Sequence, residues 1–327
     1  MKRGYLLVLG AIVLFSTIEV VSKYLQSGEG AAGRVGSTQV AALRFLFGAA
    51  FILLLLMGRR QGKFIAAAVR KDGLPIAMLG AVGVFLTFFL LHEGIAETSA
   101  STAAVVFSMN PVFTVLIASL VLRERLGVAG WLGVGLGLAG AFTAVTGFDF
   151  SGLLSREDFL GSVLVLISAA TWSVYTVYGK RYTERYGSLV LSFLTMAAGS
   201  VLFAVLLTVQ GGWGEMGGYS LRAWAWLLYL GVVTVGIGYI LYFEGLRRVT
   251  ASRGASLFYL KPVLALLFAH FALGEPISYT LLLAAVMVAS GILLVTFPKH
   301  PNKGVGGCYN ERDMEAENRD PTGDRST

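Results

Sequence analysis

Two stretches of the chain repeat one pattern. Residues 99–124 read SASTAAVVFSMNPVFTVLIASLVLRE, and residues 250–275 read TASRGASLFYLKPVLALLFAHFALGE. In both, small residues lead to a proline inside an apolar segment, and a glutamate follows that segment. The two prolines, Pro111 and Pro262, lie 151 residues apart. Self-similarity at a fixed spacing predicts that one structural unit occurs twice.

The repeat extends beyond these stretches. The same shift of 151 residues aligns Gly48 with Gly199, Gly80 with Gly231, Glu93-Gly94 with Glu244-Gly245, and Gly140 with Gly291. The first apolar segment aligns at a shift of 157, because the first loop of the N-terminal half is longer. We therefore predict two domains of one kind, residues 1–148 and 149–298. The polar residues 299–327 cannot pack a core and are predicted to form a disordered cytoplasmic tail.

Long segments without charge predict a membrane protein. Hydrophobic residues make up 56% of the 327 residues and charged residues 14%, whereas soluble domains carry about 25% charged residues. A helix that crosses the bilayer core needs roughly 20 apolar residues, and its backbone groups must be paired internally. The fold class that we predict is an all-α integral membrane protein with ten transmembrane helices. They are expected at residues 4–24, 38–57, 74–92, 98–120, 127–147, 159–179, 188–209, 223–243, 254–273 and 277–297.

Basic residues in the loops predict how these helices are oriented. With the N-terminus in the cytoplasm, 20 of the 26 Lys and Arg residues fall on the inner side, and only Arg34, Arg156 and Arg222 fall in outer loops. We thus expect a multi-pass protein of the plasma (inner) membrane with both termini cytoplasmic. Five helices per half is an odd number, so the second half enters the bilayer in the opposite sense. Such an inverted repeat is typical of secondary transporters.

The two quoted stretches resemble the EamA repeat of the drug/metabolite transporter superfamily. That repeat has a run of small residues, a proline within the helix, and an apolar end that closes on Gly-Glu or a similar pair. Arg44-Phe45 also matches its pattern, whereas Arg123 departs from the glycine kept in Leu273-Gly274-Glu275. The resemblance covers residues 4–297. It implies a ten-helix transporter with a central cavity that exports or exchanges small organic metabolites.

Four charged residues, Glu19, Lys23, Arg44 and Lys261, fall inside the predicted spans, where a charge costs several kcal/mol unless it is paired or hydrated. Lys23 lies near the end of its span, where its side chain can reach the membrane surface. Glu19 and Arg44 have equal predicted depths in consecutive helices, so we expect them to form a buried ion pair. The pair is either structural or functional; in a functional site Glu19 carries a proton or binds an amine, and Arg44 binds a carboxylate or phosphate. Lys261 has no acidic residue in its own span and is expected to face the substrate. A cavity with these residues favours anionic or amino-acid-like solutes.

Pro111 and Pro262 are predicted helix breaks, because neither can donate a hydrogen bond to the carbonyl four residues earlier. Breaks at corresponding points of two inverted halves favour a site near the middle of the membrane; in the alternative interpretation the prolines only kink their helices. Asn110 corresponds to Lys261 and is a further substrate-binding candidate. The aromatic candidates are Trp172, Tyr175 and Tyr259, although aromatic side chains in spans more often pack or lie at the interface.

Several function classes are disfavoured by the sequence. The spans contain no nucleophile–base pair or set of metal ligands, so we predict that the protein is not an enzyme and uses no cofactor or metal. The net charge of +7 is divided among the inner loops, which excludes a nucleic-acid partner. The expected partners are a small-molecule substrate, the lipid bilayer, and protons or a counter-substrate. A lipid-headgroup flippase and a receptor or scaffold that does not transport remain as alternatives.

Overall fold

The computed structural model describes residues 2–28, 33–59, 61–121, 127–148, 157–246 and 257–296. Every regular element in these ranges is helical, which confirms the all-α class. The predicted tail at 299–327 lies outside the described residues, as do Arg123 and Arg156.

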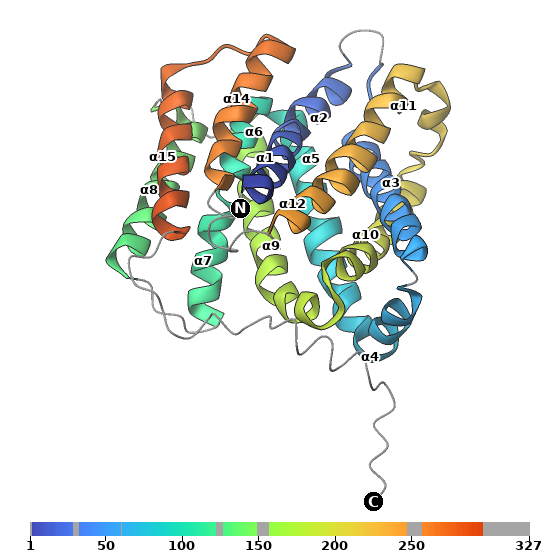
Figure 1. The fold of residues 1–327 in the computed structure, drawn as a ribbon. Helices are drawn as coiled ribbons and strands as arrows, with labels where there is room; N and C mark the ends of the chain where they lie inside the picture. Colours follow the sequence, from blue (N-terminus) through green and yellow to red (C-terminus); the bar gives the residue numbers. More distant parts are fainter. Residues whose placement is uncertain are drawn as a thin grey trace, which may run out of the picture. The chain divides into compact units, whose positions relative to one another are not determined.

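The helices follow the chain in two series (Figure 1). The first contains α1 (Lys2–Phe15), α2 (Ile18–Ser27), α3 (Ser37–Gly58), α4 (Gly62–Gly80), η2 (Ala81–Leu86), α5 (Thr87–Glu97), α6 (Ala100–Phe107), α7 (Asn110–Val121) and α8 (Val128–Thr146). The second contains α9 (Glu157–Tyr186), α10 (Ser188–Gln210), η4 (Gly214–Gly218), α11 (Leu221–Leu228), η5 (Tyr229–Ile237), α12 (Gly238–Leu246), η6 (Leu257–Tyr259), α14 (Leu260–Leu273) and α15 (Tyr279–Thr296).

Nine helical stretches of the described chain are long and apolar enough to cross a membrane. The protein is therefore an integral membrane protein with all-α architecture. A further apolar helix at Leu257–Leu273 is shorter than these nine. The expected total of ten stays a prediction, because this helix is described only from residue 257 onward.

The third membrane stretch begins earlier than the predicted span at 74–92. Helix α4 starts at Gly62 and covers a basic segment that was expected to be a loop. This segment is rich in alanine, a strong helix former, so it continues the helix with its charged side chains exposed. The backbone kinks at Asp72, whose Oδ2 accepts hydrogen bonds from Arg185 Nη1 at 2.8 Å and from the Tyr186 hydroxyl at 2.5 Å.

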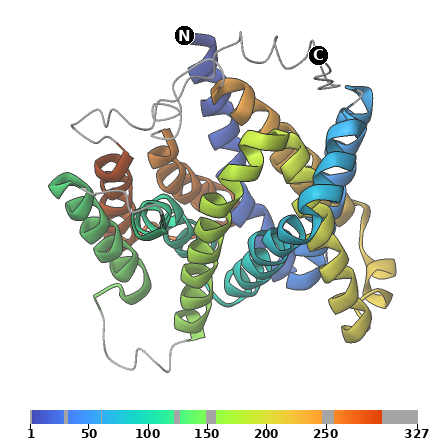
Figure 2. The same ribbon diagram turned by 90° about the horizontal axis from the view of Figure 1, so that it is seen from below.

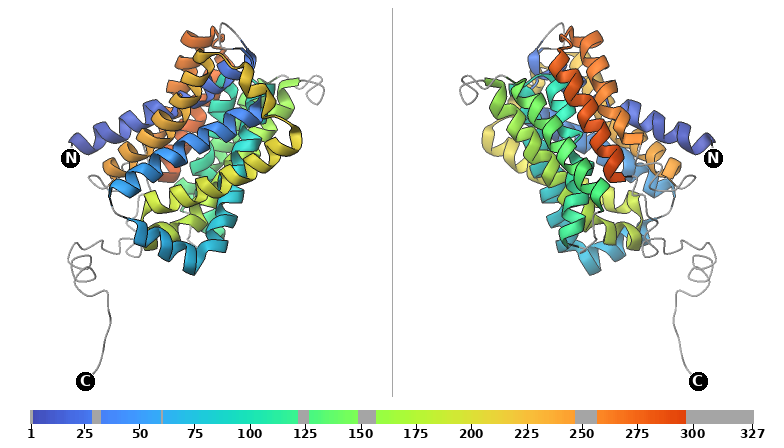
Figure 3. Two further views of the ribbon diagram at one scale, coloured as in Figure 1. Left: turned by 90° about the vertical axis from the view of Figure 1, so that its right-hand side faces the viewer. Right: turned by 90° about the vertical axis from the view of Figure 1, so that its left-hand side faces the viewer.

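The two series pack on each other in corresponding pairs. Helix α1 packs against α12, and α9 against α5, while α3 packs against η5 and α10 against η2. In Figure 2, α1 and α12 lie side by side near the N-terminus. Helices α8 and α15, the last of each series, also pack together, as the right-hand view of Figure 3 shows.

Glycines permit this close packing at positions that the repeat relates. A Cβ on Gly48 would lie 2.6 Å from Val235 Cγ1, and a Cβ on Gly199 would lie 2.4 Å from Val84 Cγ1. The shift of 151 residues converts Gly48 into Gly199 and Val84 into Val235. The contact therefore recurs with the two halves exchanged, as a twofold relation between them requires.

Irregular helix also occurs at related positions. The π-helical segment η2 corresponds, after the shift, to the last six residues of η5. π-Helical segments are rare and are often found at functional sites. A break between α6 and α7, at Ser108 and Met109, precedes Pro111, and the short 3-10 helix η6 precedes the second proline, Pro262.

One break has no counterpart. Helix α1 ends at Phe15 and α2 begins at Ile18, whereas α9 runs without interruption through the corresponding residues. The hydroxyls of Ser16 and Thr17 donate to the carbonyls of Ile12 and Leu14, each at 2.8 Å, in addition to the backbone N–H groups of the same two residues. The break therefore makes the two halves locally different next to Glu19.

The glutamate that ends the second quoted stretch binds backbone donors, as expected for a residue in a loop. Glu275 accepts hydrogen bonds from the backbone N–H groups of Ala100 and Ser101, at 2.8 and 2.9 Å. These are the first two residues of α6, so the carboxylate caps that helix and ties it to the end of α14. The corresponding Glu124 lies outside the described residues.

Candidate functional site

A buried ion pair joins the two halves of the chain. Lys261 Nζ, on α14, lies 2.7 Å from Glu19 Oε1, on α2, and the side chains are 4% and 0% exposed. The ammonium also lies 4.9 Å from the centre of the Phe107 ring, at the end of α6. Buried charges of this kind are tolerated because each neutralises the other.

The predicted ion pair between Glu19 and Arg44 is wrong, because the partner of Glu19 is Lys261. Equal depth in two consecutive helices fixes the height of two side chains but not the direction in which each points. The guanidinium carbon of Arg44 lies 4.8 Å from the centre of the Phe88 ring and 5.1 Å from that of Phe45. Arg44 still interacts electrostatically with Glu19, at longer range than an ion pair.

Seven buried polar atoms on α2, α3 and α5 have no hydrogen-bond partner among the described residues; we call the five residues that carry them the polar cluster. The atoms are Nε and Nη1 of Arg44, both ring nitrogens of His92, Oε1 of Gln26, Oγ of Ser22 and Oε2 of Glu19. All five side chains are at least nine-tenths buried. Leaving such an atom unpaired costs about 1–3 kcal/mol, and more for a charged group. The polar cluster is therefore a candidate binding site for a polar group.

Three helices place the polar cluster. Glu19, Ser22 and Gln26 are spaced three and four residues apart and so share one face of α2. This helix packs against α3, which carries Arg44, and against α5, which carries His92. Gln26 Nε2 donates to the backbone carbonyl of His92 at 3.1 Å. The unpaired donors of the planar guanidinium, on Nε and Nη1, point to different sides of the group, and each can donate to an oxygen of a bound group.

Two of the predicted aromatic residues reach the cluster through Phe88. The Trp172 ring lies 5.5 Å from the Phe88 ring, which in turn covers the guanidinium of Arg44. The Tyr175 ring lies 5.0 Å from that of Trp172 and packs on the π-helical segment, where a Cβ on Gly83 would lie 2.3 Å from Tyr175 Cγ. These two residues therefore form a wall behind the cluster.

The other candidates have different surroundings. Asn110 Nδ2 donates at 3.1 Å to the carbonyl of Phe107, the acceptor that Pro111 leaves free. Its own carbonyl accepts from Ser173 Oγ at 2.7 Å. Tyr259 packs against the apolar cluster between α8 and α15. Neither residue has a described contact with the Glu19–Lys261 pair, so substrate binding by Asn110 or Tyr259 stays a prediction.

The model of the EamA-like transporter family matches the chain twice, at residues 2–146 and 159–297. The chain belongs to this family. An uncharacterized transporter of Clostridium kluyveri is 29% identical over 296 residues, which are 90% of this chain and 93% of that protein. The uncharacterized transporter YyaM of Bacillus subtilis is 23% identical over 303 residues, 91% of this chain and 96% of the relative. A protein of known crystal structure, 23% identical, has a TM-score of 0.60 and covers 90% of this chain and 97% of its own, so it shares the fold.

As an EamA-like member of the drug/metabolite transporter superfamily, the protein is a membrane transporter for a small molecule. The predicted family and the presence of two EamA repeats are confirmed by the double match. EamA-like transporters are not enzymes in general, in agreement with the class expected from the sequence.

Three residues of the polar cluster in this EamA-like chain escaped the sequence analysis. His92 was not among the predicted site residues, because a lone histidine gives no indication of its environment. Gln26 lies two residues beyond the predicted end of the first span, and Ser22 is uncharged. The spacing of Glu19, Ser22 and Gln26 on one helical face was the signal that could have predicted the cluster.

Proposed function

We propose that this EamA-like protein is a secondary-active carrier of a small anionic or amino-acid-like solute, which binds at Glu19, Arg44 and Lys261. The observation that carries the proposal is the buried guanidinium of Arg44, with Nε and Nη1 unpaired within the described chain. The ion pair neutralises Glu19 and Lys261, so the three residues together have a net charge of +1. One carboxylate on the solute restores neutrality in this buried place.

The second oxygen of Glu19 adds a preference for amino-acid-like solutes. Glu19 Oε1 accepts from Lys261, whereas Oε2 has no partner among the described residues. A solute whose carboxylate binds Arg44 can donate an ammonium hydrogen to Oε2. Trp172 and Tyr175, behind Phe88, then limit the size of the solute's side chain.

Alternating access is the mechanism that the packing of the halves favours. Contacts that recur when the halves are exchanged support two inverted five-helix repeats, which have two related conformations of similar energy. The ion pair joins α2 of one half to α14 of the other, so rocking of the halves changes its geometry. A proton on Glu19 weakens the pair, which couples export or exchange to protons; a counter-substrate serves the same purpose. The basic loops favour cytoplasmic termini in the plasma (inner) membrane.

Binding and transport by the purified protein test this function. A thermal-shift panel of amino acids, carboxylates, phosphate esters and nucleosides is followed by uptake of the stabilising solutes into liposomes. We expect Arg44→Ala and Arg44→Lys to weaken binding at least tenfold, because only a guanidinium in this position offers donors on different sides of one planar group. Arg222→Ala is the matched control, since Arg222 is an exposed arginine at the start of α11.

Two results would contradict the proposal: stabilisation by cations alone, or unchanged binding by Arg44→Ala. Movement of labelled phospholipid between leaflets without solute uptake would instead favour a lipid-headgroup flippase. A receptor or scaffold would show neither activity.

A further inference from the structure

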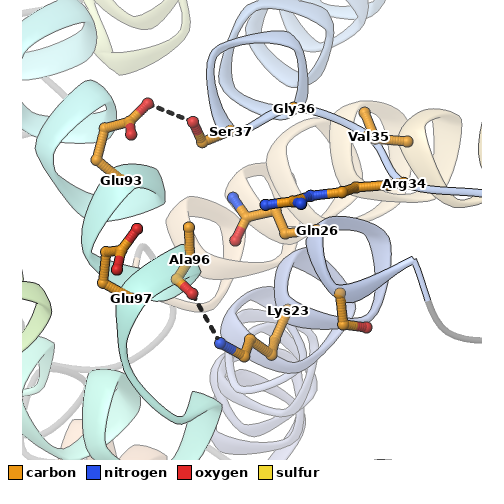
Figure 4. Close-up of a pocket in the computed structure, with 10 residues that line it drawn as sticks. Lys23, Gln26, Arg34, Val35, Gly36, Ser37, Glu93, Ala96 and Glu97 are labelled. Atoms are coloured by element: carbon orange, nitrogen blue, oxygen red, sulfur yellow. Dashed lines mark hydrogen bonds between the residues drawn. The ribbon is translucent and has the colours of Figure 1, made fainter. Parts of the chain in front are cut away.

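A polar pocket of about 400 Å³ lies at the end of α2, beside the last turn of α5 (Figure 4). Its walls are the end of α2, the loop that follows it, the start of α3, and α5. Its volume falls within the range of small-molecule sites. The residues of the Glu19–Lys261 pair are not among those that line it.

Opposite charges face each other across this pocket. Glu93 and Glu97 project from α5 on one side, and Arg34 extends from the opposite side (Figure 4). Neither Arg34 nor Glu97 has an ion-pair partner within the ranges that the structure describes. A carboxylate binds Arg34 and an ammonium binds the two glutamates, so the pocket fits a solute that carries both groups.

The backbone holds the charged groups in place. The Val35 N–H donates to the Leu25 carbonyl at 2.8 Å, and the Val35 side chain is fully buried. These contacts fix the backbone next to Arg34, which lines the pocket. Lys23 Nζ donates to the carbonyls of Ile95 and Ala96, both at 3.0 Å, and so ties α2 to the end of α5. The pocket is thus built by fixed contacts between elements.

One residue that lines the pocket, Gln26, also belongs to the polar cluster. Gln26 lines the pocket with a side chain that is 6% exposed, and its Oε1 has no partner among the described residues. Its Nε2 donates to the backbone carbonyl of His92. Neither ring nitrogen of His92 has a partner among the described residues. Gln26 therefore lines the open pocket and also belongs to the polar cluster that contains Arg44.

We propose that this pocket is a second solute site, specific for a zwitterion, and that Gln26 separates it from the site at Arg44. Binding in the pocket requires only the charges on its walls. The passage of the solute past Gln26 to Arg44 rests on the proposed function.

Protection of a cysteine in the pocket tests the second site. Ala96→Cys places a thiol in the lining of the pocket, and Cys308→Ser removes the only native cysteine. The full-length protein in nanodiscs then reacts with a small methanethiosulfonate reagent, which forms a mixed disulfide with the thiol and releases methanesulfinate. The probes are L-glutamine, L-glutaminamide, which lacks the carboxylate, and glutaramate, which lacks the ammonium. We expect L-glutamine to slow the reaction at least fivefold at saturation, and the other two to have less than a twofold effect.

Variants of the charged residues that line the pocket test whether the protection arises from binding there. Arg34→Ala and Glu97→Gln should each raise the concentration of L-glutamine for half-protection at least tenfold. The exposed control Arg222→Ala should leave it within twofold. Both pocket side chains are exposed, so folding is expected to persist and is checked by the melting temperature; Glu97→Gln keeps the side-chain size if Arg34→Ala does not fold.

Three results would overturn the second site: no protection by L-glutamine, equal protection by all three probes, or half-protection that Arg34→Ala and Glu97→Gln leave unchanged. Failure of the proposed function has a different signature. In that case Arg44→Ala leaves binding and uptake unchanged, while the thiol in the pocket is still protected by L-glutamine.

Discussion

Arg44 and the Glu19–Lys261 pair illustrate two ways to hold charge inside a membrane protein. The two charges of the pair neutralise each other, with 2.7 Å between the charged atoms. Arg44 instead lies against Phe45 and Phe88, and its donors are left for another group. Aromatic faces stabilise a guanidinium without using its hydrogen-bond donors. The pair therefore satisfies its own charges, whereas Arg44 keeps donors without a partner among the described residues.

The pair predicts a non-additive response to mutation. Lys261→Met or Glu19→Gln alone should lower the free energy of unfolding by about 3–5 kcal/mol, because each leaves a buried group without its partner. The double variant should recover most of this loss, since no unpaired charge remains. Denaturant titration in mixed micelles measures the cycle, with Arg222→Ala as the control. Additive losses in the double variant would mean that the two residues do not interact.

For single residues, the sequence predicted which charged side chains lie inside the membrane spans better than it predicted their interaction partners. Glu19, Arg44 and Lys261 stood out because charge is costly in apolar spans. Their pairing depends on rotation about the helix axes, which depth along the chain does not determine. His92 and Gln26 belong to the polar cluster through contacts between helices, and no local pattern of residues indicates such contacts.

At the level of helices, the relation between the two halves is seen in the glycine contacts and in the helix irregularities. The sequence predicted both proline breaks and the pairing of Gly48 with Gly199 by position. It did not predict the break between α1 and α2, because Ser16 and Thr17 are not strong helix breakers. Their hydroxyl groups bind backbone carbonyls of the preceding turn at that break. This unpaired irregularity lies next to Glu19, where only one half supplies a carboxylate.

Reciprocal packing predicts matched effects of glycine substitutions. Gly48→Ala and Gly199→Ala should each destabilise the protein by about 1–3 kcal/mol, because the added methyl group would lie 2.6 or 2.4 Å from a valine of the other half. Gly135→Ala is the control within a helix, since nothing lies within 4 Å of a Cβ there. It should be neutral or stabilising by up to about 1 kcal/mol. Thermal unfolding in detergent distinguishes the three variants, and a loss for Gly135→Ala equal to the others would exclude the packing explanation.

For the whole molecule, the account depends on how the two EamA repeats are threaded through the membrane. Contacts that survive exchange of the halves indicate a twofold relation, and the odd number of predicted helices per half places its axis in the membrane plane. The basic loops predict that the end with α4 faces the cytoplasm. We expect such a bundle to open alternately to either side around the ion pair and Arg44.

Residues that correspond in the two repeats should therefore lie on opposite sides of the membrane. Arg70 and Leu221 are related by the shift of 151 residues, and both are exposed. The measurement is labelling of Arg70→Cys and Leu221→Cys, each in a Cys308→Ser background, by a maleimide that does not cross membranes. We predict that intact cells label Leu221→Cys, and that Arg70→Cys reacts only after lysis. Labelling of both variants from the same side would contradict the inverted repeat and the carrier mechanism based on it.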